Sequence, residues 1–154
     1  MLQPRLARIP ISEVPETLRA GFVALVVELG LRTSTLPRLA GALGVPLALE
    51  EHTWLDRTAP SGSMSELPDW AKTRVRIVQR ILRRWPFGDT CLRQALVSGQ
   101  RLRRLHPSLN VGVAKVDGEV RAHAWLVIDG LIVDPRFAAA SYLTLSTPSR
   151  GSRR

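Results

Sequence analysis

Apolar residues near the start of the chain recur at steps of three and four, which is the spacing of one face of an α-helix. This pattern predicts a helix from Pro15 to Leu31. The residues that we expect to form its buried face are Leu18, Phe22, Leu25, Val26 and Leu29. A shorter helix is predicted from Thr35 to Leu43, because Gly44 and Pro46 directly after it favour a helix end.

Two further helices follow a polar segment. Residues 56–67 (DRTAPSGSMSEL) are rich in turn-forming residues, so we interpret them as a loop or linker. Pro68 favours the start of a third helix that ends by Pro86, and its apolar stripe comprises Ala71, Val75, Val78, Ile81, Leu82 and Trp85. A fourth helix is predicted from Asp89-Thr90-Cys91 to His106-Pro107, and the residues expected to face the core are Leu92, Ala95, Leu96, Leu102 and Leu105.

Beyond Pro107 the apolar period changes from that of a helix to that of a strand. Short strands are predicted at Asn110–Val116, Val120–Ile128 and Leu131–Val133. They are joined by Asp117-Gly118 and Asp129-Gly130, which are strong signals for two-residue hairpin turns. Such turns pair Val116 with Glu119 and Ile128 with Leu131. The prediction is an antiparallel three-stranded meander, and the fold class is α+β.

Size and composition favour one soluble globular protein of three parts. The chain has 154 residues, 45% of them hydrophobic, which is enough for a core without disulfides or a structural metal. We expect an N-terminal helical accessory region with its linker (1–67), a core domain (68–145) and a disordered basic tail (146–154). No secretory signal or membrane span is evident. One cysteine cannot form an internal disulfide, so we expect a cytoplasmic protein, and no spacing typical of a metal site is present.

The chain is strongly basic, with 22 basic and 13 acidic residues and a net charge of +9. Such a charge attracts nucleic acid, anionic membranes or acidic peptides. A solvated arginine-rich surface that reflects genome composition is an equally good explanation. The arginines that gather near two helix ends are Arg76, Arg80, Arg83, Arg84, Arg101, Arg103 and Arg104.

The single cysteine, Cys91, stands at the predicted start of the fourth helix. Asp89 or Thr90 is the expected N-cap, so Cys91 falls in the first turn. The unpaired N–H groups and the dipole at a helix start favour a thiolate, which is the nucleophilic form of a cysteine. The same N–H groups can bind an oxyanion. The alternative is a small buried hydrophobic residue, which is what most lone cysteines are.

A cysteine nucleophile needs a base that is held in place by a third group, and His123 is the best candidate for the base. If Asp129-Gly130 is a two-residue turn, strand alternation puts Asp134 one diagonal step from His123 on the same sheet face. Diagonal neighbours lie about 7–8 Å apart at Cα, a gap that two side chains can bridge. Asp129 lies about 20 Å from His123 along the strand, so we assign it to the turn.

Two neighbours of His123 have possible roles in substrate binding. The predicted register places Gly112 opposite His123, which leaves space for a substrate backbone, although a glycine in a strand often marks a bulge. Trp125 shares the face of His123 and would shield it from water, or it simply packs in the core. The other histidines, His52 in a loop-like stretch and His106 at a helix end, are poor candidates for the base.

The order of these residues resembles the transglutaminase-like cysteine protease superfamily. The matching positions are Cys91 at a helix start, His123 in the HAW tripeptide on a strand, and Asp134 at the end of the next strand. More narrowly, WPFGDTCLRQAL and VRAHAWLVIDG resemble the leader peptidases of lasso-peptide biosynthesis in their split form, over residues 70–134. The resemblance implies an α+β fold with a transglutaminase-like or papain-like core. In that core the nucleophile helix packs on a small antiparallel sheet and N-terminal helices precede it.

The activity that this resemblance implies is hydrolysis of a peptide bond. A cysteine endopeptidase with a Cys91-His123-Asp134 triad would remove the leader from a ribosomally made precursor peptide, without a cofactor. In fused members a winged-helix-like domain binds the leader, and residues 1–67 lack the strands for one. The expected partners are therefore the precursor, a separate PqqD-like leader-recognition protein and, after cleavage, the ATP-dependent lasso cyclase.

Two other functions compete with a leader peptidase. The same triad would serve a transglutaminase-like acyltransferase on another peptide substrate, because the residues do not reveal whether water or an amine accepts the acyl group. A non-enzymatic arginine-rich module for nucleic acid or an anionic surface is the second alternative. It leaves the Cys, His and Asp pattern unexplained, so we rank it below the peptidase.

Overall fold

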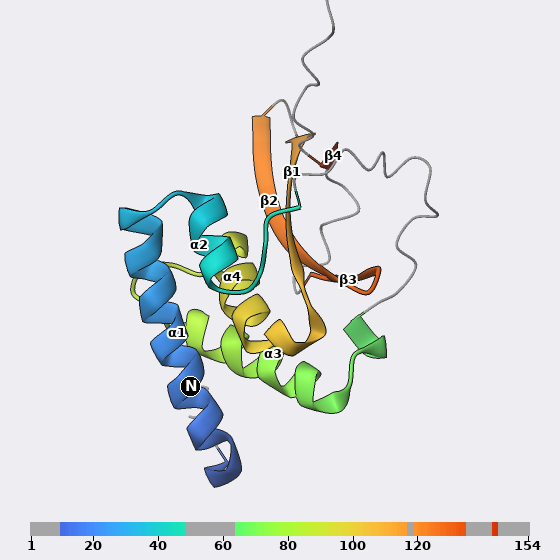
Figure 1. Ribbon diagram of the computed structural model, residues 1–154. Coiled ribbons are helices and arrows are strands. Elements are labelled where there is room, and N and C mark those ends of the chain that lie inside the picture. The colour runs from blue at the N-terminus through green and yellow to red at the C-terminus, as the bar shows by residue number, and fades with distance from the viewer. Residues whose placement is uncertain (1–9, 49–63, 117–118, 135–142, 145–154) are drawn as a thin grey trace, which may run out of the picture.

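The helices pack on one side of a small sheet, as the α+β prediction requires (Figure 1). The computed structural model describes residues 10–48, 64–116, 119–134 and 143–144. Its helices are α1 (Val14–Thr33), α2 (Leu36–Ala42), α3 (Asp69–Leu82) and α4 (Cys91–Arg101), and its strands are β1 (Ser108–Val116), β2 (Glu119–Ile128), β3 (Leu131–Val133) and β4 (Leu143–Thr144). Single 3₁₀ turns lie at Ile11–Glu13, Met64–Glu66 and Arg103–Leu105.

The four predicted helices are confirmed, with boundaries shifted by a few residues. Proline stands in the first turn of α1 and α2, and Pro68 is the N-cap residue of α3. Helix α3 ends at Leu82, before the predicted limit at Pro86, and tight turns continue the chain to Trp85. The predicted loop at 56–67 lies mostly outside the described residues, and so does the tail from Ser146.

The predicted meander is confirmed in its register. Strand β1 pairs with β2 so that Val116 faces Glu119, and β2 pairs with β3 so that Ile128 faces Leu131. Asp129 and Gly130 both have positive φ angles, 48° and 80°, as a type I′ hairpin turn requires. The other turn, at residues 117–118, lies outside the described residues.

The sheet has one strand that the sequence pattern did not predict. Its order is β3-β2-β1-β4, because the two-residue strand β4 pairs with β1 opposite Gly112 and Val113. A strand this short carries no detectable alternation of apolar and polar residues. On the same side of β1, Leu47 forms an isolated bridge with Leu109.

The predicted buried face of α1 is wrong. The side chains expected in the core are exposed, by 70% at Leu18, 68% at Phe22 and 64% at Leu29. The residues that α1 does bury are mostly small: Ala20, Val23, Ala24, Val27 and Glu28. Small side chains let α1 pack closely against α3 and α4, and its apolar residues continue around the helix. Spacing alone therefore did not indicate which side faces inward.

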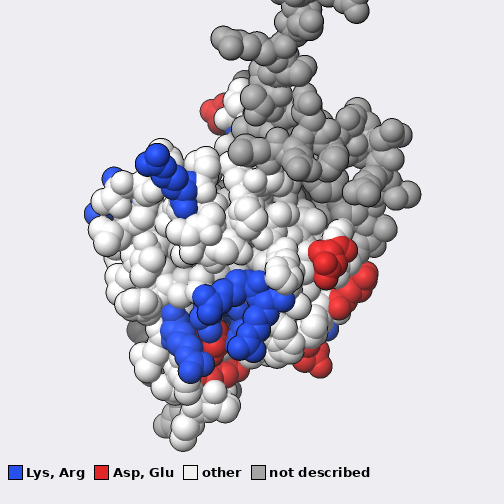
Figure 2. Space-filling model, viewed as in Figure 1, with Lys and Arg blue, Asp and Glu red and all other residues white. Residues whose placement is uncertain are grey.

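Ion pairs fix this orientation of α1. Each of its acidic side chains, with the neighbouring Glu13, meets an arginine of α3 or α4: Glu13–Arg80 at 2.8 Å, Glu16–Arg101 at 2.7 Å and Glu28–Arg93 at 2.8 Å. Figure 2 shows acidic side chains enclosed by basic ones in the lower part of this face. Two members of the predicted arginine cluster, Arg80 and Arg101, thus have structural partners.

Glu28 is buried, and its carboxylate is held by two arginines. Arg93 donates to Oε2 at 2.8 Å and Arg32 donates to Oε1 at 3.2 Å. The hydrogen bond from Arg93 lowers the pKa of Glu28 below its ordinary value of 4.5, against the opposing effect of burial. A pKa that is lower in the folded state than in the unfolded state stabilises the fold above the unfolded pKa.

Glu28→Gln is therefore expected to lower the melting temperature at pH 7. The difference from wild type should persist down to about pH 5. It should shrink as the pH falls through 4.5 toward the lower folded pKa, because the wild-type carboxylate then becomes protonated. Thermal unfolding followed by circular dichroism from pH 3 to pH 8 measures this. Glu119→Gln, at an exposed pair with Arg121, is the control that should change little. A pH-independent difference for Glu28→Gln would contradict the prediction.

Helix α4 lies directly on the sheet. A Cβ atom added to Gly99 would come within 2.7 Å of Val45 and within 3.1 Å of Leu126 on β2. Only a glycine permits this approach, and it brings α4 close to the strand that carries His123. Within the described residues, no helix has the length and apolarity that crossing a bilayer requires.

Candidate active site

Cys91 is the first residue of α4, as predicted. Thr90 is the N-cap, and its Oγ1 accepts a hydrogen bond from the backbone N–H of Arg93 at 3.3 Å. The carbonyl of Thr90 accepts the N–H of Gln94 at 3.0 Å. The cysteine side chain is half-buried at the edge of the hydrophobic core. This placement puts a thiol beside the first N–H groups of a helix, where an anion is stabilised.

His123 and Asp134 come together across β2 and β3. The Nε2 atom of His123 lies 2.9 Å from Oδ2 of Asp134, and both side chains are buried, with 5% and 3% of their areas exposed. The register explains the contact, because Leu126 faces Val133 and Asp134 is the next residue after β3. The diagonal neighbourhood predicted for these two residues is thus observed.

The hydrogen bond to Asp134 determines which nitrogen of the His123 ring carries the hydrogen. A carboxylate only accepts hydrogen bonds, so Nε2 carries the hydrogen in the pair. In a neutral imidazole the other nitrogen, Nδ1, then has the lone pair and is the basic atom. The same carboxylate stabilises the imidazolium that forms when Nδ1 takes a proton.

Trp125 and Gly112 occupy the positions that the register predicted. The Trp125 ring is buried and stacks on His123, with centroids 5.9 Å apart and planes inclined by 23°. Gly112 is directly opposite His123 on β1. The Trp125 ring therefore covers one side of the imidazole. Gly112, which has no side chain, is its partner on the neighbouring strand.

Helix α4 and strand β2 run in the same direction along the molecule (Figure 1). Gly99 is the residue of α4 that lies beside Leu126 of β2. Cys91 precedes Gly99 by about 12 Å along a helix, and His123 precedes Leu126 by about 10 Å along a strand. The first turn of α4 therefore lies at about the level of His123.

The structure joins two of the three predicted triad members and not the third. Side chains alternate along β2, so His123 and Trp125 lie on one face while Leu126, on the other face, contacts α4. Among the residues that the structure describes, the Sγ atom of Cys91 makes no hydrogen bond. The thiol and the imidazole are thus at a similar level without a hydrogen bond between them.

Two buried polar residues near this region were missed by the sequence analysis. Gln94, one helical turn after Cys91, donates through Nε2 to Asp89 at 2.5 Å, while its buried Oε1 has no hydrogen-bond partner among the described residues. Asn110 is buried opposite Trp125. A polar residue inside an apolar stripe was the available signal for Gln94. The two remaining histidines add nothing here, since His106 is exposed in a left-handed helix-end position and His52 is outside the described residues.

The described side chains do not form a metal-binding cluster. Within the ranges that the structure describes, three or more His, Cys, Asp or Glu residues do not gather to hold a metal ion. The chemistry available to the described groups is proton transfer by the His123–Asp134 pair and nucleophilic attack by a thiol.

Comparison with known protein families identifies the superfamily of the chain. The family model described as the transglutaminase-like superfamily matches residues 25–147, which is most of the sequence. The chain belongs to the transglutaminase-like superfamily. Neither curated proteins nor solved structures gave a match. Members of the transglutaminase-like superfamily are generally cysteine proteases or acyltransferases, and the helix-plus-sheet architecture is consistent with that fold. The matched range includes the C-terminal part of α1, from Leu25 to Thr33, and all of α2.

Proposed function

We propose that this chain is a cysteine endopeptidase that removes the leader from a ribosomally made lasso-peptide precursor in the cytoplasm. The observation that carries the proposal is the buried His123–Asp134 hydrogen bond of 2.9 Å, which fixes the imidazole with Nδ1 as the base. Membership of the transglutaminase-like superfamily supports a thiol nucleophile, and Cys91 is the single cysteine of the chain. The WPFGDTCLRQAL and HAW motifs support the narrower assignment to leader cleavage.

Acylation is the first half of the proposed reaction. Nδ1 of His123 takes the proton of Cys91, and the sulfur attacks the carbonyl carbon of the scissile peptide bond. The tetrahedral intermediate collapses when the imidazolium gives its proton to the leaving amine. The products of this half are the free core peptide and a thioester between Cys91 and the leader.

Deacylation completes the cycle with water. His123 takes a proton from water, the hydroxide oxygen attacks the thioester, and the proton returns to the departing sulfur. The leader leaves with a carboxylate end and Cys91 is regenerated. In both halves Asp134 keeps the hydrogen on Nε2, so the proton is always exchanged at Nδ1.

The backbone at the start of α4 supplies the oxyanion donors in this proposal. The Thr90 cap occupies the N–H groups of Arg93 and Gln94. The N–H groups of Cys91 and Leu92 are the other donors of the first turn, and they point out of the helix end toward a bound anion. Gly112 leaves room beside the imidazole for the extended substrate, and Trp125 keeps water from the far side of the ring.

The proposal requires the sulfur of Cys91 to meet Nδ1 of His123 when substrate is bound. Contacts between a nucleophile and its base are commonly longer in substrate-free enzymes than in the reacting complex. We therefore assign the closing of the Cys91–His123 contact to substrate binding.

Leader recognition is assigned to a separate PqqD-like protein. The described part of residues 1–67 consists of helices, two 3₁₀ turns and one isolated bridge, and α1 is used to complete the hydrophobic core. None of it forms the winged-helix sheet that a built-in leader-binding domain would need. The cleaved core peptide would pass to an ATP-dependent cyclase that closes the macrolactam ring.

Mass spectrometry of peptide cleavage tests the proposal. The purified chain is incubated with a candidate precursor peptide and a candidate PqqD-like leader-recognition protein, with each protein omitted in turn. The expected result is two fragments whose masses add up to that of the precursor plus one water, formed efficiently only with both proteins. Intact precursor under all conditions would contradict leader cleavage. A product linked to an added amine would instead show an acyltransferase.

A further inference from the structure

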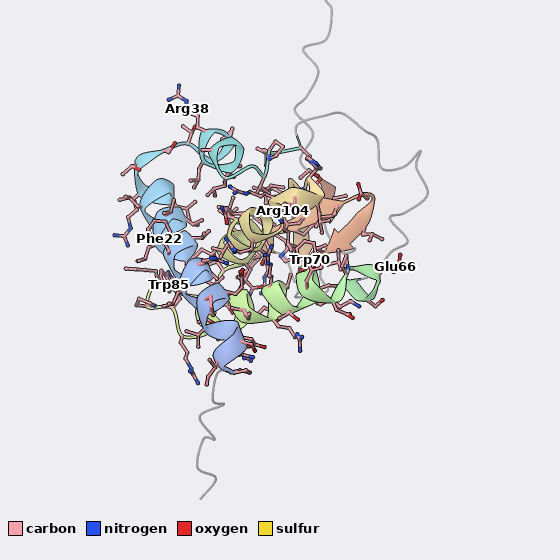
Figure 3. All side chains as sticks on the ribbon, turned by 60° about the horizontal axis from the view of Figure 1, so that its bottom comes forward. Phe22, Arg38, Glu66, Trp70, Trp85 and Arg104 are labelled. Carbon is pink, nitrogen blue, oxygen red and sulfur yellow. The ribbon has the colours of Figure 1, made fainter. Side chains whose placement is uncertain are left out.

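The outward side of α1 carries a continuous apolar surface. We define the α1 outer stripe as Ile11, Val14, Leu18, Phe22, Leu25, Val26 and Leu29, all of them exposed. In Figure 3 the labelled Phe22 extends from the side of α1 that faces away from the other helices. Monomeric proteins rarely expose apolar patches larger than about 300–600 Å², and larger ones mark interaction sites. Six exposed large side chains on α1, with Ile11 on the adjoining 3₁₀ turn, are of that order.

The spacing within the α1 outer stripe indicates a helix as its partner. Within α1, Leu18, Phe22, Leu25 and Leu29 follow steps of four, three and four residues. This is the a/d pattern of a coiled coil, in which side chains of one helix insert between those of another. The opposite side of α1 is already packed on α3 and α4, so the helix carries two apolar faces, of which the described residues cover only one.

The rim of the stripe is basic in the part of the chain that the structure describes. Arg19 and Arg32 lie exposed on α1 itself, and Arg83 and Arg84 lie exposed just after α3. The end of α3 is beside the start of α1, as the 2.8 Å pair between Arg80 and Glu13 shows. The acidic residues of α1 point to the covered side and are paired there with arginines.

We propose that the α1 outer stripe docks a helix of a partner protein whose leucine-type residues are flanked by Asp and Glu. A carboxylate-rimmed helix would satisfy both the heptad spacing and the basic rim. A second copy of this chain fits less well, because each copy carries a net charge of +9 and the same arginine rim. A phospholipid surface needs no heptad spacing.

Docking at this surface would place the partner next to the nucleophile helix. The loop between α3 and α4 runs beside α1, where the Arg32 guanidinium lies 4.7 Å from the centre of the Phe87 ring. The same α1 end contacts the first turn of α4 through Glu28 and Arg93. The inference does not depend on peptidase activity, since it rests on the α1 outer stripe and its arginine rim, and binding assays can test it separately.

A pair of designed peptides provides the test. The probe is a synthetic three-heptad helix with Leu at a and d and Glu at e and g, and the matched peptide has Lys in place of Glu. Like charges keep each peptide from self-association. Fluorescence anisotropy against the full chain should show the Glu peptide binding at least tenfold more tightly than the Lys peptide. A scrambled peptide of the same composition controls for attraction to the net charge.

Variants of the exposed side chains connect the binding to α1. Phe22→Ser and Leu25→Ser should each weaken the Glu peptide at least tenfold without lowering the melting temperature, because both residues are exposed. Val120→Ser removes an equally exposed apolar residue from β2 and should have no effect. The proposal would be overturned if Val120→Ser weakened binding of the Glu peptide as much as the α1 variants do. It would also be overturned if the scrambled peptide bound as tightly as the Glu peptide, or if the Glu peptide did not bind at all.

Two other partners for the α1 outer stripe, a second copy of the chain and a membrane, would each give a distinct result with the same variants. Sedimentation of the wild type at twice the monomer mass, reversed by Phe22→Ser, would show that a second copy covers the stripe. Flotation with vesicles of phosphatidylcholine and phosphatidylserine, lost in Phe22→Ser, would show a membrane surface if the Glu peptide also fails to bind. Either result would replace an acidic helical partner.

Discussion

Cys91→Ala is expected to lower the rate of precursor cleavage by at least about 10⁴-fold while leaving the fold intact. A triad acts as a unit, so loss of the nucleophile removes nearly all of its rate enhancement. The side chain is half-buried at the edge of the core, so an alanine there leaves only a small gap. Cleavage is followed by mass spectrometry and the fold by thermal unfolding. Unchanged cleavage by Cys91→Ala would make Cys91 a structural residue.

Alkylation of Cys91 in the presence of the leader peptide and its recognition protein tests the pairing with His123, because we expect substrate binding to close that contact. A free thiol is largely protonated at pH 6, whereas a thiolate held by an imidazolium reacts there. His123→Ala should therefore slow the reaction of Cys91 with iodoacetamide at pH 6 at least tenfold and leave it unchanged at pH 9.5. His106→Ala, at an exposed helix end, is the matched control. Equal rates at pH 6 in wild type and His123→Ala would contradict the proposed pair.

The sheet was predictable in detail because short-range chemistry determines it. Asp129-Gly130 adopts positive φ angles, which few other residue pairs tolerate. Once that turn is two residues long, side-chain alternation fixes which residues share a face. The contact between His123 and Asp134 therefore followed from the sequence, since it depends on one turn and a period of two.

The orientation of α1 depends on long-range packing, which spacing does not encode. Both sides of the helix are apolar, and the side with small residues is buried because it permits close approach to α3 and α4. The decisive signal was charge: Glu16 and Glu28 lie on the covered side and meet arginines far along the chain. The relation of Cys91 to His123 is also long-range, because it depends on how α4 lies on β2.

Asp134→Asn is expected to lower kcat at least about 100-fold with little change in KM, which is the loss typical of impaired proton transfer. The neutral amide no longer stabilises the imidazolium of His123. It can also donate a hydrogen bond to Nε2, which moves the ring hydrogen to Nδ1 and removes the base. Because Asp134 is buried beside the histidine, a carboxylate from solution cannot reach His123 and replace it. Steady-state cleavage of the precursor at a series of concentrations separates kcat from KM.

Asp129→Asn is the matched control, because it makes the same chemical change in the same hairpin. Asp129 is exposed and has a φ angle of 48°, a conformation that asparagine adopts readily. We expect cleavage within twofold of wild type and an unchanged fold. If Asp129→Asn impaired cleavage more than Asp134→Asn, the carboxylate that serves His123 would not be Asp134. Asp134→Asn with full activity would show that the 2.9 Å bond orients a buried histidine without taking part in catalysis.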